Sequence, residues 1–402
     1  MVNVDSESFL AIATVAALAA LLAGLLAGSR LPLPVVVLEI VLGIVIGPEL
    51  LGLAKADDFI DFFSSLGLGM LFFFAGYEID FERIRGSPLR LAVLGWLLSL
   101  ALAYSLGALL EMSGVVLSLV FTGSALATTA IGTLIPVLSD AGELHTRFGT
   151  YLLAAGAAGE FGPILLVTLV FSTKSAGANA IILALFIAVA VLAAVVAVRS
   201  VGRGWGRLER NLETSGQLGI RVAVLMVFGL AALAASLGLD LLLGGFVAGV
   251  IVRLALKGHE VRLFESKLIG VGYGFFIPFF FVVSGIKFDL DALVDDPVNL
   301  LKLPLFLALF LVVRGAPALL LYRNEFDSRD RMALAIFSST ALPMVVAITT
   351  IAIQQGHMRS ATAASLIGAA ILSTTIFPIV GLRLRGDRAA LAGRGGAAPD
   401  AA

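Results

Sequence analysis

Residues 154–172, AAGAAGEFGPILLVTLVFS, form a mostly apolar run with a single charged side chain, Glu160. A run of about 20 apolar residues can cross the hydrocarbon core of a bilayer as a helix. A carboxylate at the centre of such a helix costs about 2.5–3.5 kcal/mol on insertion scales, so it usually faces a cavity or a partner. The stretch therefore predicts a membrane helix whose acid has a specific role.

Similar apolar runs recur along the chain, whose 402 residues are 59% hydrophobic and 14% charged. A soluble protein would carry nearer a quarter charged residues. We predict an all-α polytopic membrane protein with membrane lipid around it, no soluble domain and no nucleic-acid partner. The absence of cysteine excludes disulfides and thiolate metal sites. The thirteen predicted spans are 9–28, 33–53, 62–79, 91–110, 114–138, 148–172, 179–198, 220–237, 239–253, 268–286, 300–322, 332–354 and 361–382.

The positions of the basic residues predict an orientation. If the N-terminus is outside, twenty of the 27 Lys and Arg residues fall in cytoplasmic segments. Cytoplasmic loops carry an excess of Lys and Arg, so we expect a cell-membrane protein with its N-terminus outside and its C-terminus in the cytoplasm. Residues 1–384 form the predicted transmembrane domain, and 385–402 a disordered cytoplasmic tail. The outer segments carry Lys55, Lys174, Lys287, Lys302 and Arg359.

Three pairs of similar segments lie seven spans apart, which predicts an internal repeat. Because seven is odd, the second copy must be inverted in the membrane. Inverted repeats with interrupted helices are typical of secondary transporters, whose binding site lies near the bilayer midplane. The repeats cover roughly 33–172 and 239–382. The pairs are LEIVLGIVIGP (38–48) with LDLLLGGFVAG (239–249), LFFFAGYEIDFERI (71–84) with FFVVSGIKFDLDAL (280–293), and FTGSALATTA (121–130) with FSSTALPMVV (337–346).

Deep charges and prolines mark the candidate site. Glu160 lies in the sixth span, and Arg314 lies in the eleventh, in the other repeat. Pro163 cannot donate a hydrogen bond to the carbonyl of Gly159, and Pro317 frees a carbonyl beside Arg314 in the same way. Each freed carbonyl must be satisfied by protein, by water in a cavity or by a bound ion. A carboxylate beside a free carbonyl is the oxygen chemistry that hard cations prefer.

The fifth and twelfth spans add hydroxyl groups and helix breaks. Both segments are predicted to unwind at the midplane, where half-helix ends would place partial charges at one point. Together with Glu160 they describe a site for a transient Na⁺ or K⁺ and a proton. The residues concerned are Thr128 and Thr129 in one break, and Ser338, Ser339, Thr340 and Pro343 in the other.

Plainer interpretations stay open beside these. Glu160 and Arg314 could form a permanent structural salt bridge, and the Ser and Thr clusters could be ordinary small-residue helix packing. Glu39, six residues into its span, could be satisfied by backbone groups near Gly43 or by the interface. The histidines, His145, His259 and His357, all fall in predicted loops.

The chain resembles the membrane domain of the cation:proton antiporter-2 group of monovalent cation/proton exchangers, from about residue 30 to 384. The segments that carry the resemblance are LPVVVLEIVLGIVIGPELLG, LGMLFFFAGYEIDF, SALATTAIGTLIPVLSDAGELHTRFG, LGGFVAGV and FFIPFFFVVSGIKFD. The resemblance implies thirteen spans, a dimer-forming domain, and a core domain with two crossed, broken helices around Thr128–Thr129 and Ser339–Thr340. It implies a homodimer.

The resemblance also implies roles for single residues. The ion-binding acid matches Glu160, and Gly159 stands where the family usually carries Asn, Asp or Gln. A basic residue before the second broken helix matches Arg314, and arginine there is associated with electroneutral members. The potassium-efflux relatives carry a C-terminal nucleotide-binding regulator, which has no counterpart here.

We therefore predict a secondary transporter, not an enzyme, that exchanges Na⁺ or K⁺ for H⁺ without a cofactor. Glu160 would carry either a proton or the cation, and Arg314 would supply fixed compensating charge, giving electroneutral 1:1 exchange. Two alternatives remain: a sodium-coupled symporter in which Arg314 binds an organic carboxylate, and a homologue that does not transport.

Overall fold

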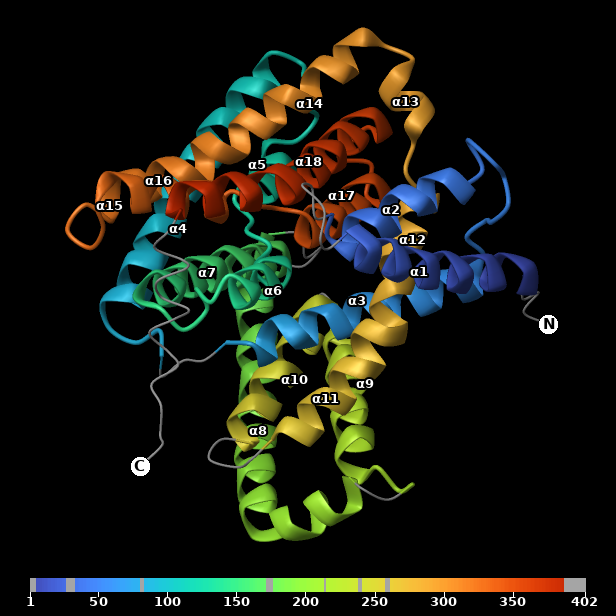
Figure 1. Ribbon diagram of the computed structural model, residues 1–402, viewed down its shortest axis with the longest axis vertical. Helices are drawn as coiled ribbons and strands as arrows, with labels where there is room; N and C mark the ends of the chain where they lie inside the picture. Colours follow the sequence, from blue (N-terminus) through green and yellow to red (C-terminus); the bar gives the residue numbers. More distant parts are fainter. Residues whose placement is uncertain are drawn as a thin grey trace. The chain divides into compact units, whose positions relative to one another are not determined.

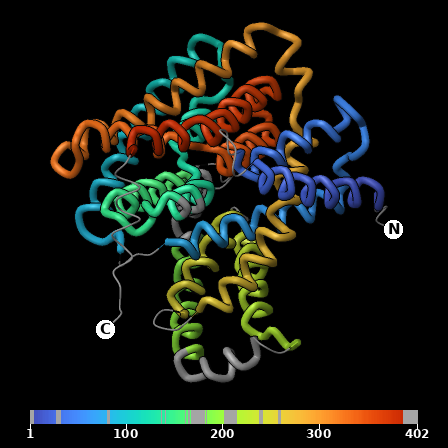
Figure 2. The backbone as a smooth tube through the Cα atoms, in the orientation of Figure 1, coloured from blue at the N-terminus to red at the C-terminus, as the bar shows by residue number. Residues whose placement is uncertain are grey.

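The computed structural model describes residues 5–26, 33–79, 83–170, 176–212, 215–237, 241–256 and 261–386; the others are drawn as a thin grey trace in Figure 1 and are among the grey parts of Figure 2. All regular structure in the described residues is helical, so the predicted all-α class is confirmed. The chain divides into two compact units, each built from two separate stretches of sequence. Unit 1 comprises Met1–Ile79 and Ile164–Phe288, and unit 2 comprises Asp80–Pro163 and Asp289–Ala402.

In unit 1, helices from the two predicted repeats pack in exchanged pairs: α3 packs against α10, and α2 packs against α12 (Figure 1). Each pair joins one helix of the first repeat to one of the second, as expected of two inverted copies. The helices are α1 (Ser6–Leu26), α2 (Val35–Ile46), α3 (Asp58–Tyr77), α8 (Ala176–Leu212), α9 (Leu218–Ser236), α10 (Leu241–Ala255), α11 (Arg262–Val271), the π-helical turn η1 (Gly272–Phe276) and α12 (Ile277–Ile286).

Glycines allow both helix pairs to approach closely. A side chain at Gly249 of α10 would collide with the Phe73 carbonyl of α3, and one at Gly43 of α2 would collide with the Val282 carbonyl of α12. Phe73 and Val282 occupy equivalent positions in the repeated segments LFFFAG and FFVVSG. Small residues at such interfaces let backbones meet where lipid gives no hydrophobic driving force.

Unit 2 contains both interrupted spans, α5–α6 and α16–α17. Helix α18 packs against α14, α16 and α17 (Figure 1). An apolar core that includes Leu134, Leu152, Leu334 and Phe337 fills the space among α6, α7, α15 and α16. The elements are α4 (Ser87–Met112), α5 (Leu119–Leu126), α6 (Ile131–Asp140), α7 (Arg147–Val170, in unit 2 up to Pro163), α13 (Leu290–Val294), α14 (Pro297–Phe310), the π-helical turn η2 (Leu311–Gly315), α15 (Ala316–Leu321), α16 (Ser328–Ser338), α17 (Pro343–Gln354) and α18 (Ser360–Arg385).

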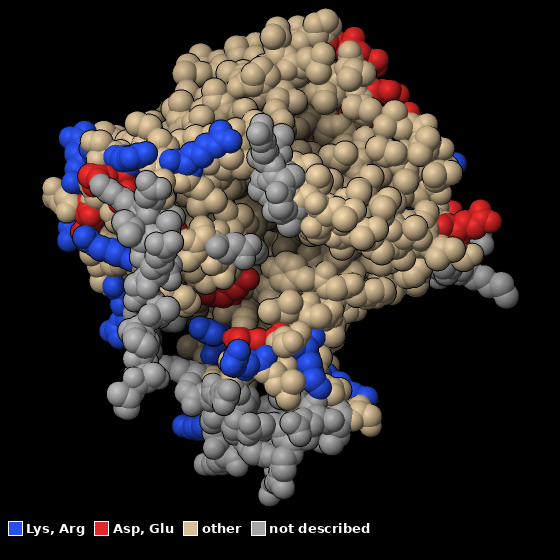
Figure 3. Space-filling model, viewed as in Figure 1, with Lys and Arg blue, Asp and Glu red and all other residues tan. Residues whose placement is uncertain are grey.

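The helices follow the predicted spans. In the described part of the chain, nine helices are long and apolar enough to cross a membrane. Most of the surface visible in Figure 3 belongs to uncharged residues, as a lipid-facing surface requires. Two ends differ from expectation. Helix α8 continues to Leu212 through a segment expected to be a loop, and α18 continues through Arg385, which was expected to begin the tail. The rest of the predicted tail, from residue 387, lies outside the described residues.

Both π-helical turns end two residues before a proline, Pro278 after η1 and Pro317 after η2. A proline ring inside an α-helix clashes with the carbonyl four residues earlier, and a wider turn relieves that clash. The second of these turns carries Arg314. Beside Pro317, for which the sequence predicted a freed carbonyl, the structure shows a local widening of the helix at the basic residue.

Candidate ion-binding site

Two helix breaks form the centre of the site. Helix α5 ends at Leu126 and α6 begins at Ile131, whereas α16 ends at Ser338 and α17 begins at Pro343. Proline is favoured at the first position of a helix because its missing N–H would have no partner there.

Hydroxyl groups terminate the helices that lead into the breaks. Thr128 Oγ1 donates to the Ala125 carbonyl at 2.8 Å, and Ser339 Oγ donates to the Ala335 carbonyl at 2.7 Å. Bonds of this kind compete with the helical pattern, because they give the backbone another partner. Both residues, predicted as part of the site, are fully buried.

The two breaks are in direct contact. The Ala130 N–H donates to the Thr340 carbonyl at 2.8 Å, and Thr129 Oγ1 donates to the Ser338 carbonyl. The structure thus contains the crossed pair of broken helices that was predicted. Unwound backbone of this kind is tolerated at membrane depth only where protein or water satisfies it.

Glu160 lies in α7, next to the contact between the breaks, and its residue is 4% exposed. The preceding residue, Gly159, accepts a hydrogen bond at its carbonyl from the Thr129 N–H at 3.1 Å. This is the carbonyl that Pro163 was expected to free. Of the three predicted ways to satisfy it, the structure uses protein, and the bond joins α7 to the first break.

Arg314 is also 4% exposed, and all three guanidinium nitrogens donate hydrogen bonds. Nε donates to Thr129 Oγ1 at 2.8 Å, Nη1 to Ser99 Oγ at 3.1 Å, and Nη2 to the Ala155 carbonyl at 3.0 Å. Within the described part of the chain, these partners are neutral oxygens. Arg314 is thus held by two hydroxyls and a backbone carbonyl from three segments of unit 2.

Position 159 has no room for a side chain. A Cβ atom there would lie 2.6 Å from Arg314 Nη2 and 2.7 Å from Thr129 Oγ1. The guanidinium and the threonine hydroxyl occupy the space that a polar side chain at this position would need. The resembled family carries Asn, Asp or Gln at this position. Here the neighbours of Gly159 fill the space that such a side chain would occupy.

Two buried hydroxyls at the second break lack a hydrogen-bond partner among the described residues, Ser338 Oγ and Thr340 Oγ1. Both residues are almost fully buried. Buried polar atoms normally have a partner, and water or an ion is a common one. Both atoms are oxygens, the ligand type that hard cations prefer.

Other predicted residues lie elsewhere. Glu39 belongs to unit 1, where it is buried in α2. His145 and His357 are exposed, and His259 lies outside the described residues.

The sequence did not single out Ser99 or Ser373, both of which serve the site. Ser373 Oγ accepts a hydrogen bond from the Ala341 N–H at 3.0 Å and so caps the second break. A hydroxyl within an apolar span was the available signal for each of them.

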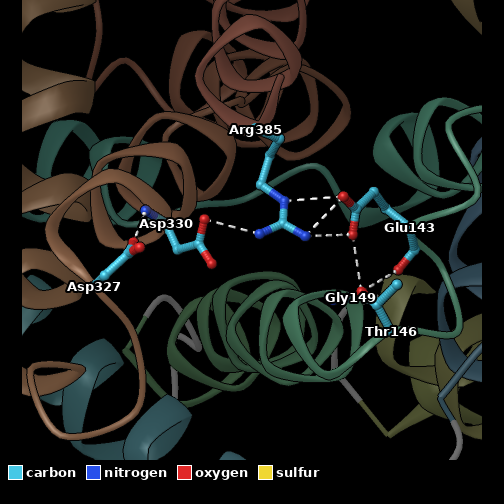
Figure 4. A network of polar contacts seen from close by, with 6 residues as sticks. All are labelled: Glu143, Thr146, Gly149, Asp327, Asp330 and Arg385. Carbon is cyan, nitrogen blue, oxygen red and sulfur yellow. Dashed lines mark hydrogen bonds and ion pairs between the residues drawn. The ribbon is translucent and has the colours of Figure 1, made fainter. Parts of the chain in front are cut away.

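A second polar network in unit 2 surrounds Arg385 at the end of α18 (Figure 4). Its guanidinium forms a bidentate pair with Glu143, with distances of 2.7 and 2.8 Å from Nη2, and contacts Asp330 at 2.8 Å. Thr146 Oγ1 donates to Glu143 at 2.9 Å, and the Arg385 guanidinium stacks over Phe148. The network joins the α6–α7 loop, the first turn of α16 and the end of α18.

The crossed breaks, the buried acid and the buried arginine define a membrane transporter of the inverted-repeat class. The sequence model of the family described as "Sodium/hydrogen exchanger, transmembrane" matches residues 17–382. The chain belongs to this family, which is one of transporters and not of enzymes.

Similarity to individual proteins supports the same family membership. The chain is 28% identical to YjbQ of Bacillus subtilis over 87% of its own length, and spans 59% of the length of that protein. It is 29% identical to the Na(+)/H(+)-K(+) antiporter GerN of Bacillus cereus, over 66% of this chain and 68% of GerN. The solved structure of the sodium proton antiporter MjNhaP1 from Methanocaldococcus jannaschii superposes with a TM-score of 0.62 at 17% identity, covering 96% of this chain and 98% of that one. This likeness shows the fold.

Proposed function

We propose that the chain exchanges a monovalent cation, Na⁺ or K⁺, for H⁺ across the cell membrane, with Glu160 as the shared carrier of proton and cation. The observation that carries the proposal is the Glu160 carboxylate, buried beside the contact of the two helix breaks. A buried carboxylate is costly as a bare anion, so it favours a bound proton or a bound cation. If only the neutralised forms cross the low-dielectric barrier, competition between the two enforces exchange.

The stoichiometry follows from the charges. Arginine stays protonated at physiological pH, so Arg314 adds a fixed charge and no second transported proton. One carboxylate then gives one cation per proton and no net charge moved. The engagement of all three Arg314 nitrogens also disfavours the symporter alternative, which needs a guanidinium free to bind an organic carboxylate.

Two further parts of the proposal concern the orientation of the chain in the membrane and its oligomeric state. The positive-inside pattern supports an outer N-terminus and a cytoplasmic C-terminus. The family resemblance supports a homodimer.

The experiment uses the purified full chain in proteoliposomes with an internal pH-sensitive dye. Addition of Na⁺, K⁺ or Li⁺ should dissipate an imposed pH gradient in the wild type, and Glu160→Gln should abolish this exchange. Glu111→Gln, which changes an exposed carboxylate at the end of α4, is the matched control and should behave as the wild type. Exchange that survives in Glu160→Gln contradicts the carrier assignment, and a wild type inactive with every cation supports the non-transporting alternative.

A membrane potential tests the stoichiometry separately. A net charge moved would feel about 2.3 kcal/mol per 100 mV. The exchange rate should therefore not change when a potential of either sign is imposed. A rate that depends on the potential refutes 1:1 exchange.

A further inference from the structure

We propose that Ser373 on α18 is a positioning residue for the second helix break: its hydroxyl keeps the chain between α16 and α17 unwound, and so sets where the oxygens of that break lie. The inference rests on the proposed exchange of a monovalent cation for H⁺, but not on which residue carries the ion. Ser373 acts through the backbone of Ala341 and does not itself bind the ion.

The two breaks share a backbone contact that their sequences do not reveal. Each consists of four residues, between α5 and α6 or between α16 and α17. The third residue of each break donates its backbone N–H to the helix of the next predicted span. Thr129 donates to the Gly159 carbonyl of α7 at 3.1 Å, and Ala341 donates to Ser373 Oγ of α18 at 3.0 Å. Helices α7 and α18 are the sixth and thirteenth predicted spans, so the two contacts occupy corresponding positions in the inverted repeats.

The two acceptors differ in kind. In α7 the acceptor is a backbone carbonyl, the one that Pro163 frees within the helix. In α18 it is the hydroxyl of Ser373, a fully buried side chain. A backbone carbonyl is present whatever the side chain, whereas the hydroxyl depends on the residue. The second contact can therefore be removed by a single substitution.

Ser373 serves both backbone polar groups of Ala341. Its Oγ accepts from the Ala341 N–H and lies 3.0 Å from the Ala341 carbonyl oxygen. The Ala370 carbonyl of its own helix is 2.8 Å away, so the single hydroxyl proton can serve either carbonyl. Thr374 Oγ1 also donates to the Ala341 carbonyl, at 3.5 Å. Ala341, Ser373 and Thr374 are at most 1% exposed, so these contacts replace the helical partners that the unwound residue lacks.

The alternative conformation of this segment is a longer α16. In a continuous helix the Ala341 N–H would donate to the carbonyl four residues earlier, that of Phe337. Here the Phe337 carbonyl accepts from the Thr340 N–H at 3.1 Å instead. Pro343 removes one helical bond of the segment, but not the one from Ala341 to Phe337. Because an unpaired buried N–H is costly, loss of the Ser373 hydroxyl favours the winding of α16 through Ala341.

Such winding would rearrange the site. The carbonyls of Ser338 and Thr340 accept the hydrogen bonds that join the two breaks, and the hydroxyls of the same residues are buried without a partner among the described residues. Carbonyls in an α-helix point along its axis, so a wound segment withdraws the Thr340 carbonyl from the first break. If only the unwound form binds the cation, the apparent affinity falls in proportion to the population of that form.

Ser365 provides a matched comparison on the same helix. It is fully buried, and its Oγ donates to the Ala361 carbonyl at 2.8 Å and to the Asn299 carbonyl at 2.9 Å. It thus resembles Ser373 in its helix, its burial and its bond to the preceding turn. Its hydroxyl, however, joins α18 to α14 instead of to a break. Ser365→Ala therefore controls for the loss of a buried hydroxyl from α18.

The first experiment measures the dependence of exchange on Na⁺ and K⁺ concentration in proteoliposomes for the wild type, Ser373→Ala and Ser365→Ala. Ser373→Ala should raise the apparent KM for the cation about fivefold, the equivalent of one hydrogen bond, with the maximal rate within about twofold of the wild type. Ser365→Ala should keep the wild-type KM. An unchanged KM in Ser373→Ala, or an equal rise in Ser365→Ala, overturns the proposal.

The second measurement does not depend on transport. The chain has no cysteine, so spin labels can be attached through Met332→Cys on α16 and Ile353→Cys on α17, both exposed positions. Pulsed electron paramagnetic resonance then gives the distribution of distances across the break. Adding Ser373→Ala should shift or broaden this distribution, whereas adding Ser365→Ala should not. A distribution that Ser373→Ala leaves unchanged overturns the proposal.

The two proposals fail separately. If the wild type exchanges cations but Ser373→Ala keeps both its KM and its distance distribution, only this inference fails. If the wild type exchanges none of the cations, the proposed function fails, and the spin-label distances still decide whether Ser373 holds the second break unwound.

Discussion

Unit 2 buries two arginines that look alike in exposure, 4% for Arg314 and 7% for Arg385, but differ in their partners. Arg385 is held between two carboxylates, Glu143 and Asp330. Arg314 donates to two hydroxyls and a carbonyl. The charge of Arg385 is neutralised where it lies, so its network is complete. The charge of Arg314 is not neutralised by these contacts and acts on its surroundings. Burial alone therefore does not distinguish an arginine paired with carboxylates from one held by neutral oxygens, whereas the partners do.

The largest effect on stability is expected when the Arg385 network is broken. Arg385→Gln leaves Glu143, which is fully buried, without its counter-ion. Breaking a buried ion pair from one side costs about 3–5 kcal/mol. We expect a marked fall of Tm in detergent, with exchange per folded molecule within about twofold of the wild type.

A paired replacement tests whether the cost arises from the isolated charge. Glu143→Leu combined with Arg385→Met removes both buried charges and should recover most of the lost stability. Loss of exchange in Arg385→Gln without loss of stability would break the contrast with Arg314.

A smaller stability effect, with a larger functional one, is expected at Arg314. Arg314→Gln removes hydrogen bonds to three oxygens but isolates no described carboxylate partner, so unfolding should become easier by about 1–3 kcal/mol. Exchange should be lost, because the compensating charge proposed above is gone. Tm and proteoliposome exchange measured on the same preparations check both parts. A stability loss as large as that of Arg385→Gln, with exchange intact, would reverse the assignment.

The smallest effect is expected at an exposed ion pair of the same unit, Arg147 with Glu325. Hydrogen bonds from Tyr151 and then Ser87, together with Arg147, lower the pKa of Glu325 below its ordinary value. The side chain of Arg147 is 63% exposed, so solvent screens the pair and Glu325→Gln should cost less than about 1 kcal/mol.

The pH dependence of this pair has a defined sign. Since the folded-state pKa of Glu325 is lowered, its contribution is present above the unfolded value of about 4.3 and is lost as the pH falls through the folded value. The Tm difference between the wild type and Glu325→Gln should therefore shrink as the pH falls below about 4. A difference that grows on acidification would contradict this reading.

The sequence was sufficient for the features that depend on local composition. A charge in an apolar run identified Glu160 and Arg314 as candidates, and Pro343 with the neighbouring hydroxyls located the second helix break. The similar segments seven spans apart predicted an inverted fold, and α2 and α10 indeed pack on exchanged partners. Each of these signals lies within a few residues of the feature that it predicts.

Contacts over long sequence separations were not predictable in the same way. Ser99 and Arg314 are 215 residues apart, and Glu143 and Arg385 are 242 residues apart. Nothing in the composition of α4 distinguishes a serine that meets a guanidinium from one that faces lipid, because that depends on the rotation of packed helices. Arg385 was assigned to the tail because Gly, Ala and Arg follow it, although its carboxylate partners hold it in α18.

One hydroxyl, that of Thr129, has a mechanical consequence. It accepts from Arg314 and donates to the Ser338 carbonyl, while the backbone N–H of the same residue donates to Gly159. Four separate chain segments thus meet at a single amino acid. Movement of any of these segments therefore strains a hydrogen bond at Thr129, and the bond to the Gly159 carbonyl links that strain to the helix that carries Glu160.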